Sequence, residues 1–191
     1  MRVTLTGWNG FLATKLREHT EIEWTEDLNT DVLVLMGSPV FTDAELGIHD
    51  AQVLHQYVRE TIKIIDRFEG HIIFASTTGV NDIQLDHKGS TSYNLAKLYL
   101  ENYLLYEADS SAVLRIGTVV SDKPSDIAMM KPDRIQPMML NDIMPKEWDD
   151  EYLLVEDFVN TTIEAIITKK TGIVEYPLVK MSLIDLKRIT K

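Results

Sequence analysis

Short apolar runs alternate with longer amphipathic segments along the first half of the chain. The short runs predict strands. The longer segments, in which apolar residues recur every three or four positions, predict helices. The predicted strands cover residues 2–6, 31–36, 71–76 and 112–116, and the predicted helices cover residues 10–18, 48–68 and 92–106. Strands that alternate with helices in this way are typical of an α/β fold, in which helices cover a parallel sheet.

The pattern changes after Ser121. Prolines and methionines concentrate between residues 121 and 150, and prolines at that density exclude long regular elements. We therefore expect residues 1–120 to form the sheet with its helices. Residues 121–191 should form a small cap that completes the same domain. Beyond the prolines, we expect strands over residues 152–155 and 173–176 and helices over residues 157–168 and 182–189.

Composition excludes several classes of function. The 191 residues are 45% hydrophobic and carry a net charge of −11, which argues against binding to nucleic acid or to an anionic membrane. The sequence lacks an apolar stretch of the ~20 residues that a membrane helix needs, and it has no signal-peptide pattern. A cytoplasmic protein is the expectation.

Metal binding is not expected. The chain contains no cysteine, so it has no thiolate ligands. The histidines do not pair at the spacing of metal ligands; they are His19, His49, His55, His71 and His87. Among them, His87 lies in the loop before Tyr93, where a contact with substrate is the alternative to a plain surface histidine.

A glycine turn joins the first predicted strand to the first predicted helix. Gly7 and Gly10 stand at the positions that let a backbone approach a pyrophosphate, and Ala13 follows where close helix–strand packing is needed. The alternative is an ordinary strand–turn–helix corner. The predicted cofactor contacts of this turn are Gly7, Trp8, Asn9, Gly10, Phe11 and Leu12.

Tyr93 and Lys97 are the candidate acid/base pair. Residues four apart lie on one face of a helix, and an ammonium in that position stabilises a phenolate. Tyr93 could then exchange a proton with a substrate hydroxyl or carbonyl. Thr77, at the end of a predicted strand, could hydrogen-bond the reacting oxygen, with Thr78 as the alternative. Taken alone, each of these residues is more simply a core tyrosine, a surface lysine or a strand-end hydroxyl.

Taken in order, these motifs resemble the extended short-chain dehydrogenase/reductase family, of the NAD-dependent epimerase/dehydratase type that acts on nucleotide-sugars. The matching segments are residues 6–13 (TGxxGFxG), 31–38 (DVVIHLAA), 74–80 (SSxxVYG), 93–101 (YxxSKxxxE), 114–119 (LRxxNV), 154–157 (VxD) and 182–186 (SLxDL). The resemblance implies a Rossmann-like, doubly wound parallel sheet with a reduced C-terminal cap. It also implies that Tyr93, Lys97 and Thr77 are catalytic.

The same resemblance implies further cofactor contacts and a mode of assembly. Contacts to NAD are expected from Met36, Gly37, Ser38, Ser76 and Lys97, the last through ribose hydroxyls. The substrate is expected to be a nucleotide-sugar. A homodimer is expected to form through helices 48–68 and 92–106, which have broad apolar surfaces.

The chain also departs from the family pattern. Only about 24 residues separate the first strand from Asp31, so one strand–helix unit near the adenosine site is expected to be missing. Glu26 or Asp27 is the candidate acceptor of the adenosine ribose hydroxyls; alternatively, Asp27 and Leu28 line the adenine. An acidic group in this place favours NAD over NADP. Tyr57 stands where the family has a helical Asn.

The sequence excludes some of the reactions that this family catalyses and leaves two open. Thr78-Gly79 replaces the Asp-Glu of the family's dehydratases, and relatives that use a catalytic cysteine are excluded, so epimerisation or carbonyl reduction remains. Lys131 and Arg134 could contact a substrate diphosphate or be solvated loop cations. The competing hypotheses are a non-catalytic dinucleotide-binding sensor or scaffold protein of the same fold, and a purely structural dimerisation subunit.

Overall fold

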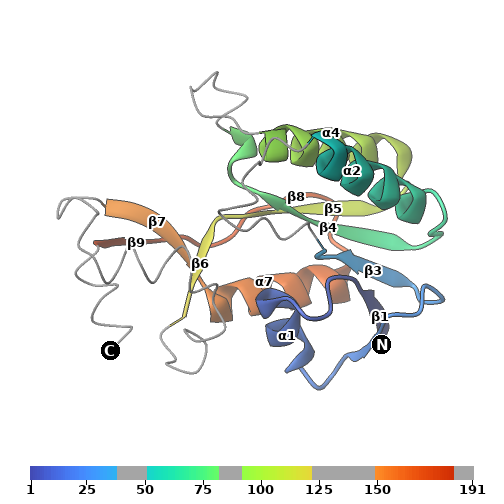
Figure 1. Ribbon diagram of the computed structural model, residues 1–191. Coiled ribbons are helices and arrows are strands. Elements are labelled where there is room, and N and C mark those ends of the chain that lie inside the picture. The colour runs from blue at the N-terminus through green and yellow to red at the C-terminus, as the bar shows by residue number, and fades with distance from the viewer. Residues whose placement is uncertain (38–50, 82–91, 122–148, 183–191) are drawn as a thin grey trace.

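The computed structural model describes residues 1–37, 51–81, 92–121 and 149–182 (Figure 1). Most of these residues belong to one parallel sheet with helices on both faces, and a smaller sheet lies to one side. The strands of the main sheet are β1 (Arg2–Leu5), β2 (Glu23–Thr25), β3 (Val32–Leu35), β4 (His71–Thr77), β5 (Ser111–Ile116) and β8 (Gly172–Val174). Their order across the sheet is β2-β1-β3-β4-β5-β8, and every pair is parallel.

Two pairs of helices cover the two faces of this sheet (Figure 1). They are α1 (Phe11–Arg17) with α7 (Val155–Thr168) on one face and α2 (Ala51–Ile65) with α4 (Ser92–Glu107) on the other. Neighbouring residues of β3 serve opposite faces: Val34 packs in the α1/α7 core and Leu33 in the α2/α4 core. The continuous apolar sequence of β3 is thereby explained, because a strand buried on both faces has no polar side.

The expected Rossmann-like, doubly wound fold is confirmed. Each strand and helix predicted within the described residues is present, with bounds that differ by a few residues. Three short strands were not predicted: β2, β6 (Thr118–Val120) and β9 (Val179–Ser182). The last two flank β7 (Asp149–Leu154) in the smaller sheet, where β6 pairs parallel and β9 antiparallel to β7.

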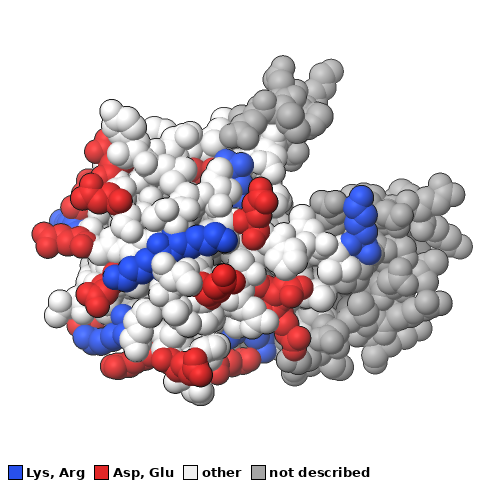
Figure 2. Space-filling model, turned by 180° about the vertical axis from the view of Figure 1, so that it is seen from behind, with Lys and Arg blue, Asp and Glu red and all other residues white. Residues whose placement is uncertain are grey.

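The edge of the main sheet beside β1 is short. After β2, residues 26–31 lead directly into β3 without a helix. This agrees with the expected loss of one strand–helix unit at the adenosine side. No helix in the described part of the chain is both long and apolar enough to cross a membrane. Figure 2 shows acidic side chains spread over the rear surface, with basic side chains standing among them singly or in small groups.

Candidate functional site

The strand order makes the carboxyl ends of β1 and β3 the candidate position for a ligand. From β1 the chain moves to β2 on one side and then to β3 on the other, so the connections diverge at the carboxyl ends of β1 and β3. Open α/β sheets bind their ligands at such a divergence. Thr6 bridges the two strand ends: its N–H donates to the Val34 carbonyl at 3.0 Å, and its Oγ1 accepts from the Gly37 N–H at 3.2 Å.

Gly7 is required by both its backbone angle and its surroundings. Its φ is +69°, in the left-handed region, and a Cβ atom at this position would lie 2.8 Å from the Gly37 backbone nitrogen. The turn is closed by a 2.8 Å hydrogen bond from the Gly10 N–H to the Gly7 carbonyl. Gly10 then caps α1 without a side-chain hydrogen bond. The result is an exposed stretch of backbone at the divergence of the strands.

Arg17 anchors this turn through contacts with Trp8. Its guanidinium carbon lies 4.3 Å from the centroid of the Trp8 ring, and its Nη2 donates to the Trp8 carbonyl at 3.1 Å. Trp8, Leu12 and Met36 pack against the α1/α7 core, whereas Asn9 is exposed. Trp8 is thus an anchor of the turn. The role of Arg17 was not foreseen from the sequence, although it stands on the helix that the turn begins.

Lys97 is buried, unlike a surface lysine. Its side chain lies on α4 with 2% of the residue exposed, and its Nζ donates to the Ala75 carbonyl of β4 at 2.7 Å. Three aromatic rings surround Nζ, with centroids at 4.7 Å (Phe74), 5.2 Å (Tyr57) and 5.6 Å (Tyr93). The structure therefore brings the two halves of the Tyr93–Lys97 pair together.

Burial controls the charge of this cluster. It lowers the pKa of Lys97 to about 7, an effect that the negative charge of Glu101 partly opposes. The pKa of Tyr57 is raised, mainly by burial and then by the neighbouring Tyr93. A lysine with a pKa near neutrality responds to any charge that comes close to it. This is a property expected of a site that handles protons.

Thr77 is the last residue of β4, as expected. Its Oγ1 accepts from the Gly79 N–H at 3.2 Å, which shapes the turn that follows the strand. This turn packs against the start of α4, since a Cβ on Gly79 would lie 2.6 Å from the Asn94 side chain. Thr78 instead turns its side chain toward Gly117. Thr77 and the helix that carries Tyr93 therefore meet at the carboxyl end of β4.

Ser76, a predicted cofactor contact, is buried at 5% exposure. Its hydroxyl finds no hydrogen-bond partner among the described residues. Buried hydroxyls are usually paired, and an unpaired one in a native site calls for an explanation.

A buried ion pair between Glu101 and Arg115 joins α4 to β5 and was not predicted. Glu101 lies one turn after Lys97, and its carboxylate accepts from Arg115 Nη2 of β5 at 2.8 Å and from Arg115 Nε at 3.2 Å. Arg115 Nη1 also donates to Asn81 Oδ1 at 2.9 Å. In the sequence, the four-residue spacing of Lys97 and Glu101 indicated that the two side chains lie on one face of the helix. The partner on β5 could be identified only once the sheet was assembled.

The adenosine side is exposed. The polar groups of Asp27 already have partners within the chain. Its carboxylate lies 3.4 Å from Arg2 and accepts from the Asn29 N–H at 3.0 Å. Its carbonyl accepts from the Thr4 hydroxyl. Glu26 is exposed, and Leu28 is 43% exposed. Of the two acidic candidates, Glu26 is therefore the one whose carboxylate is not held by the β2–β3 connection.

Several predicted positions lie outside the described residues: Ser38, His87, Lys131 and Arg134, together with most of the expected cap. Within the described ranges, no group of three His, Cys, Asp or Glu residues is arranged to hold a metal ion.

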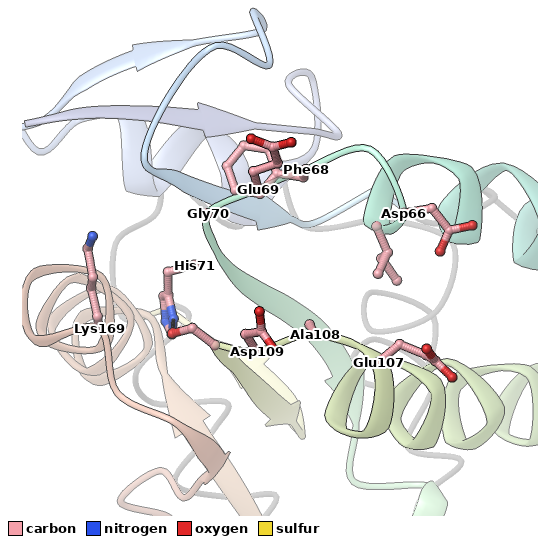
Figure 3. Close-up of a pocket in the computed structure, with 11 residues that line it drawn as sticks. Asp66, Phe68, Glu69, Gly70, His71, Glu107, Ala108, Asp109 and Lys169 are labelled. Atoms are coloured by element: carbon pink, nitrogen blue, oxygen red, sulfur yellow. Dashed lines mark hydrogen bonds between the residues drawn. The ribbon is translucent and has the colours of Figure 1, made fainter.

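A hollow lies at the opposite end of the sheet, beside the amino ends of β4 and β5 (Figure 3). It measures about 690 Å³, and its charged lining consists of Asp66, Glu69, Glu107, Asp109 and Lys169. His71, at the start of β4, is 2% exposed and contacts Ser110 Oγ through Nδ1 at 2.8 Å. Burial lowers the pKa of His71, and Lys169 lowers it further. None of the predicted catalytic or cofactor residues lines this hollow.

By sequence, no family model matches the chain and no curated protein matches it. By structure, the chain is similar to RMD from Pseudomonas aeruginosa complexed with NADPH: 14% identity, TM-score 0.72, covering 98% of this chain and 82% of that one. It is also similar to UDP-glucuronic acid 4-epimerase from Bacillus cereus in complex with NAD: 15% identity, TM-score 0.67, covering 100% and 84%.

A third similar structure is dTDP-4-dehydrorhamnose reductase from Yersinia enterocolitica: 15% identity, TM-score 0.67, covering 98% of this chain and 78% of that one. At such identities the likeness concerns the fold. The implied resemblance is confirmed at that level, because the chain folds like epimerases and reductases of this type over nearly its whole length.

Proposed function

We propose that this protein is a nicotinamide-dinucleotide-dependent oxidoreductase, either a nucleotide-sugar epimerase or a carbonyl reductase. The observation that carries the proposal is Lys97, which is buried against Tyr93 at the carboxyl end of β4. Burying an amine is costly. A purely structural helix would have no use for a lysine there, since an apolar residue of similar size would pack as well or better.

The glycine turn supports a bound dinucleotide. Gly7 approaches Gly37 so closely that no side chain fits between them, and Gly7, Asn9 and Gly10 leave backbone exposed at the strand divergence. We assign the pyrophosphate to this turn and the adenosine ribose to Glu26. Ser76 and Lys97 belong to the nicotinamide end. NAD is the expected cofactor, because an acidic side chain at the ribose disfavours the 2′-phosphate of NADP.

In the proposed mechanism the dinucleotide, when bound, supplies the hydride acceptor or donor. Tyr93 exchanges a proton with the substrate hydroxyl or carbonyl. Lys97 favours the phenolate of Tyr93 by its positive charge, and Thr77 hydrogen-bonds the same substrate oxygen. Epimerisation and reduction both use this arrangement.

The test is turnover by Tyr93→Phe, with Tyr99→Phe as the matched control because Tyr99 lies on the same helix and is 55% exposed. The probes are UDP-glucuronic acid and dTDP-4-dehydrorhamnose, supplied with NAD or NADH. We expect Tyr93→Phe to lose about 100-fold or more in kcat, as removal of a general acid/base does, and to keep its cofactor affinity. Equal turnover by both variants would contradict the assignment of Tyr93.

A non-catalytic dinucleotide sensor or scaffold of the same fold is the second candidate. The short adenosine side favours it, because that side offers few contacts in the described residues. A sensor would bind the dinucleotide and would be insensitive to Tyr93→Phe, so the same pair of variants separates the two functions.

We also propose a homodimer that uses the outer face of α4; the broad apolar surface expected on α2 is not found, because the side chains described as exposed on that helix are polar or charged. On α4, Leu95 is 52% and Tyr99 55% exposed, a large apolar area for one helix face. Sedimentation at micromolar concentration should show a dimer, and Leu95→Asp should shift it to monomer. A monomeric wild-type protein would contradict this proposal.

A further inference from the structure

The buried Glu101 stands between two cations. Lys97 precedes it by one turn on α4, and Arg115 meets it from β5 at 2.8 Å. The Glu101 side chain is 2% exposed and the Arg115 side chain 16%. With all three groups ionised, the cluster carries one net positive charge. Without the carboxylate, two cations would share a nearly water-free space.

The other groups that face Lys97 cannot replace this negative charge. On α2 the neighbour is Tyr57, whose raised pKa keeps it neutral, and on α4 it is Tyr93. From β4 Lys97 receives the Phe74 ring and the Ala75 carbonyl. An ammonium has three N–H donors, and among the described residues the hydrogen bond from Nζ goes to that carbonyl. Aromatic rings and a carbonyl stabilise a cation only in part.

The same carboxylate joins the elements that carry the proposed chemistry. Arg115 grips Glu101 on α4 and donates to Asn81 at the end of the turn that begins with Thr77. Tyr93 and Lys97 lie on α4, so one polar network fixes the helix relative to that turn. A charge-assisted pair held by two N–H groups of one arginine also has a defined orientation.

We propose that Glu101 is a positioning residue for the Tyr93–Lys97 pair: its carboxylate keeps Lys97 an ammonium, and Arg115 and Asn81 hold that carboxylate and the Thr77 turn in register. The role in catalysis rests on the proposed function, whereas the effect on the charge of Lys97 does not.

The test is the protonation midpoint of Lys97, followed by NMR of isotope-labelled lysine side chains across a pH titration. The Lys97 signal is identified by its absence in Lys97→Met. In the wild type the midpoint is expected near 7. Glu101→Gln should lower it by about one pH unit or more, which is a ~tenfold loss of ammonium at a given pH above it.

The direction of the shift in Glu101→Gln separates the proposal from a merely structural role. If Glu101 served only packing, its substitution would loosen α4, admit water and raise the midpoint toward 10.5, the ordinary value. A midpoint in Glu101→Gln that is unchanged or higher would overturn the proposal. Should Glu101→Gln fail to fold, Glu101→Asp provides the measurement, because it keeps the charge and should leave the midpoint within about half a unit of the wild type.

Turnover then tests the consequence for the reaction. In Glu101→Gln the pH profile of kcat should lose its activity at a pH lower than in the wild type, by the same interval as the NMR midpoint. If no nucleotide-sugar is turned over by the wild type, the proposed function fails while the NMR result still decides the role of Glu101. If turnover occurs and its pH profile does not follow the midpoint, the positioning role is contradicted.

Discussion

The two sides of the proposed cofactor site are built in contrasting ways. On the β4–α4 side, Lys97 and Glu101 are almost completely buried, and their contacts link a helix, two strands and a turn. On the β1–β2 side, the polar contacts are exposed and local: Arg2 meets Asp27 at 3.4 Å with both side chains about half in water. The first arrangement costs desolvation energy, and the second costs and contributes little.

The contrast indicates where the chain has retained specialised structure. Buried charges persist only where the surrounding structure holds them, and they mark sites where protons or charges are handled. The β2 edge has a strand of only three residues, with no helix between it and β3, and its charged side chains are exposed. We infer that cofactor binding depends chiefly on the glycine turn and the β4–α4 side.

Gly7→Ala should have the largest effect on binding. The substitution places a Cβ 2.8 Å from the Gly37 nitrogen and requires φ +69° of a non-glycine residue. The angle alone costs about 1–2 kcal/mol, and the clash moves the turn, so cofactor affinity should fall at least about tenfold. Gly172→Ala is the matched control, because Gly172 has φ +81° and nothing within 4 Å of its Cβ position. Isothermal calorimetry should show equal affinity for Gly172→Ala and wild type; a similar loss in both variants would mean that strain, and not the site, is responsible.

Lys97→Met should separate function from stability. An unbranched apolar side chain removes the buried amine, so the free energy of unfolding at pH 7 should rise, by about 1–4 kcal/mol for replacements of this kind, while cofactor-dependent activity is lost. Lys63→Met, an exposed control, should change stability by less than about 0.5 kcal/mol. Urea denaturation provides the measurement.

The stability gain of Lys97→Met should also depend on pH. The pKa of Lys97 is lowered to about 7 in the folded chain, so the unfolded chain binds the extra proton between pH 7 and about 10. Wild-type stability therefore falls as the pH drops through this window, and the variant lacks that contribution. The gain should be largest at pH 7 and smallest near pH 10; a gain that does not vary with pH would show that the pKa of Lys97 is the same in the folded and the unfolded chain.

Substitutions at the β2 edge should have the smallest effects. Glu26→Gln should weaken NAD binding by about two- to tenfold, the value of one exposed hydrogen bond, and reduce the preference over NADP. Asp27→Asn should leave the affinity unchanged, because its carboxylate serves Arg2 and Asn29. Competition binding of NAD and NADP measures both, and the reverse outcome would transfer the ribose contact to Asp27.

The sequence predicted the elements whose patterns are local. The continuous apolar run of β3 predicts a strand, and the spacing of apolar residues in α2 predicts a helix, without any knowledge of tertiary contacts. β2 escaped prediction because the three residues Glu23–Thr25 include a charge and form a strand only by pairing with β1. The β7–β9 sheet likewise depends on pairing between distant segments.

The candidate site was predictable as a set of residues and not as an arrangement. Tyr93 and Lys97 lie on one helix, so their four-residue spacing was enough to predict that they lie on the same face. The aromatic surroundings of Lys97 come from α2 and β4, and the partner of Glu101 comes from β5. These contacts join segments that only the folded sheet brings together, and the low pKa of Lys97 follows from the burial that results.

The most direct test of the account is calorimetric titration of the purified protein with NAD, NADH, NADP and NADPH, beside the Lys97→Ala variant. We predict a Kd in the micromolar range for NAD or NADH, weaker binding of the phosphorylated forms, and a loss of affinity in Lys97→Ala. Absence of binding by all four dinucleotides would contradict the central claim. The chain would then share the fold of these enzymes without their cofactor.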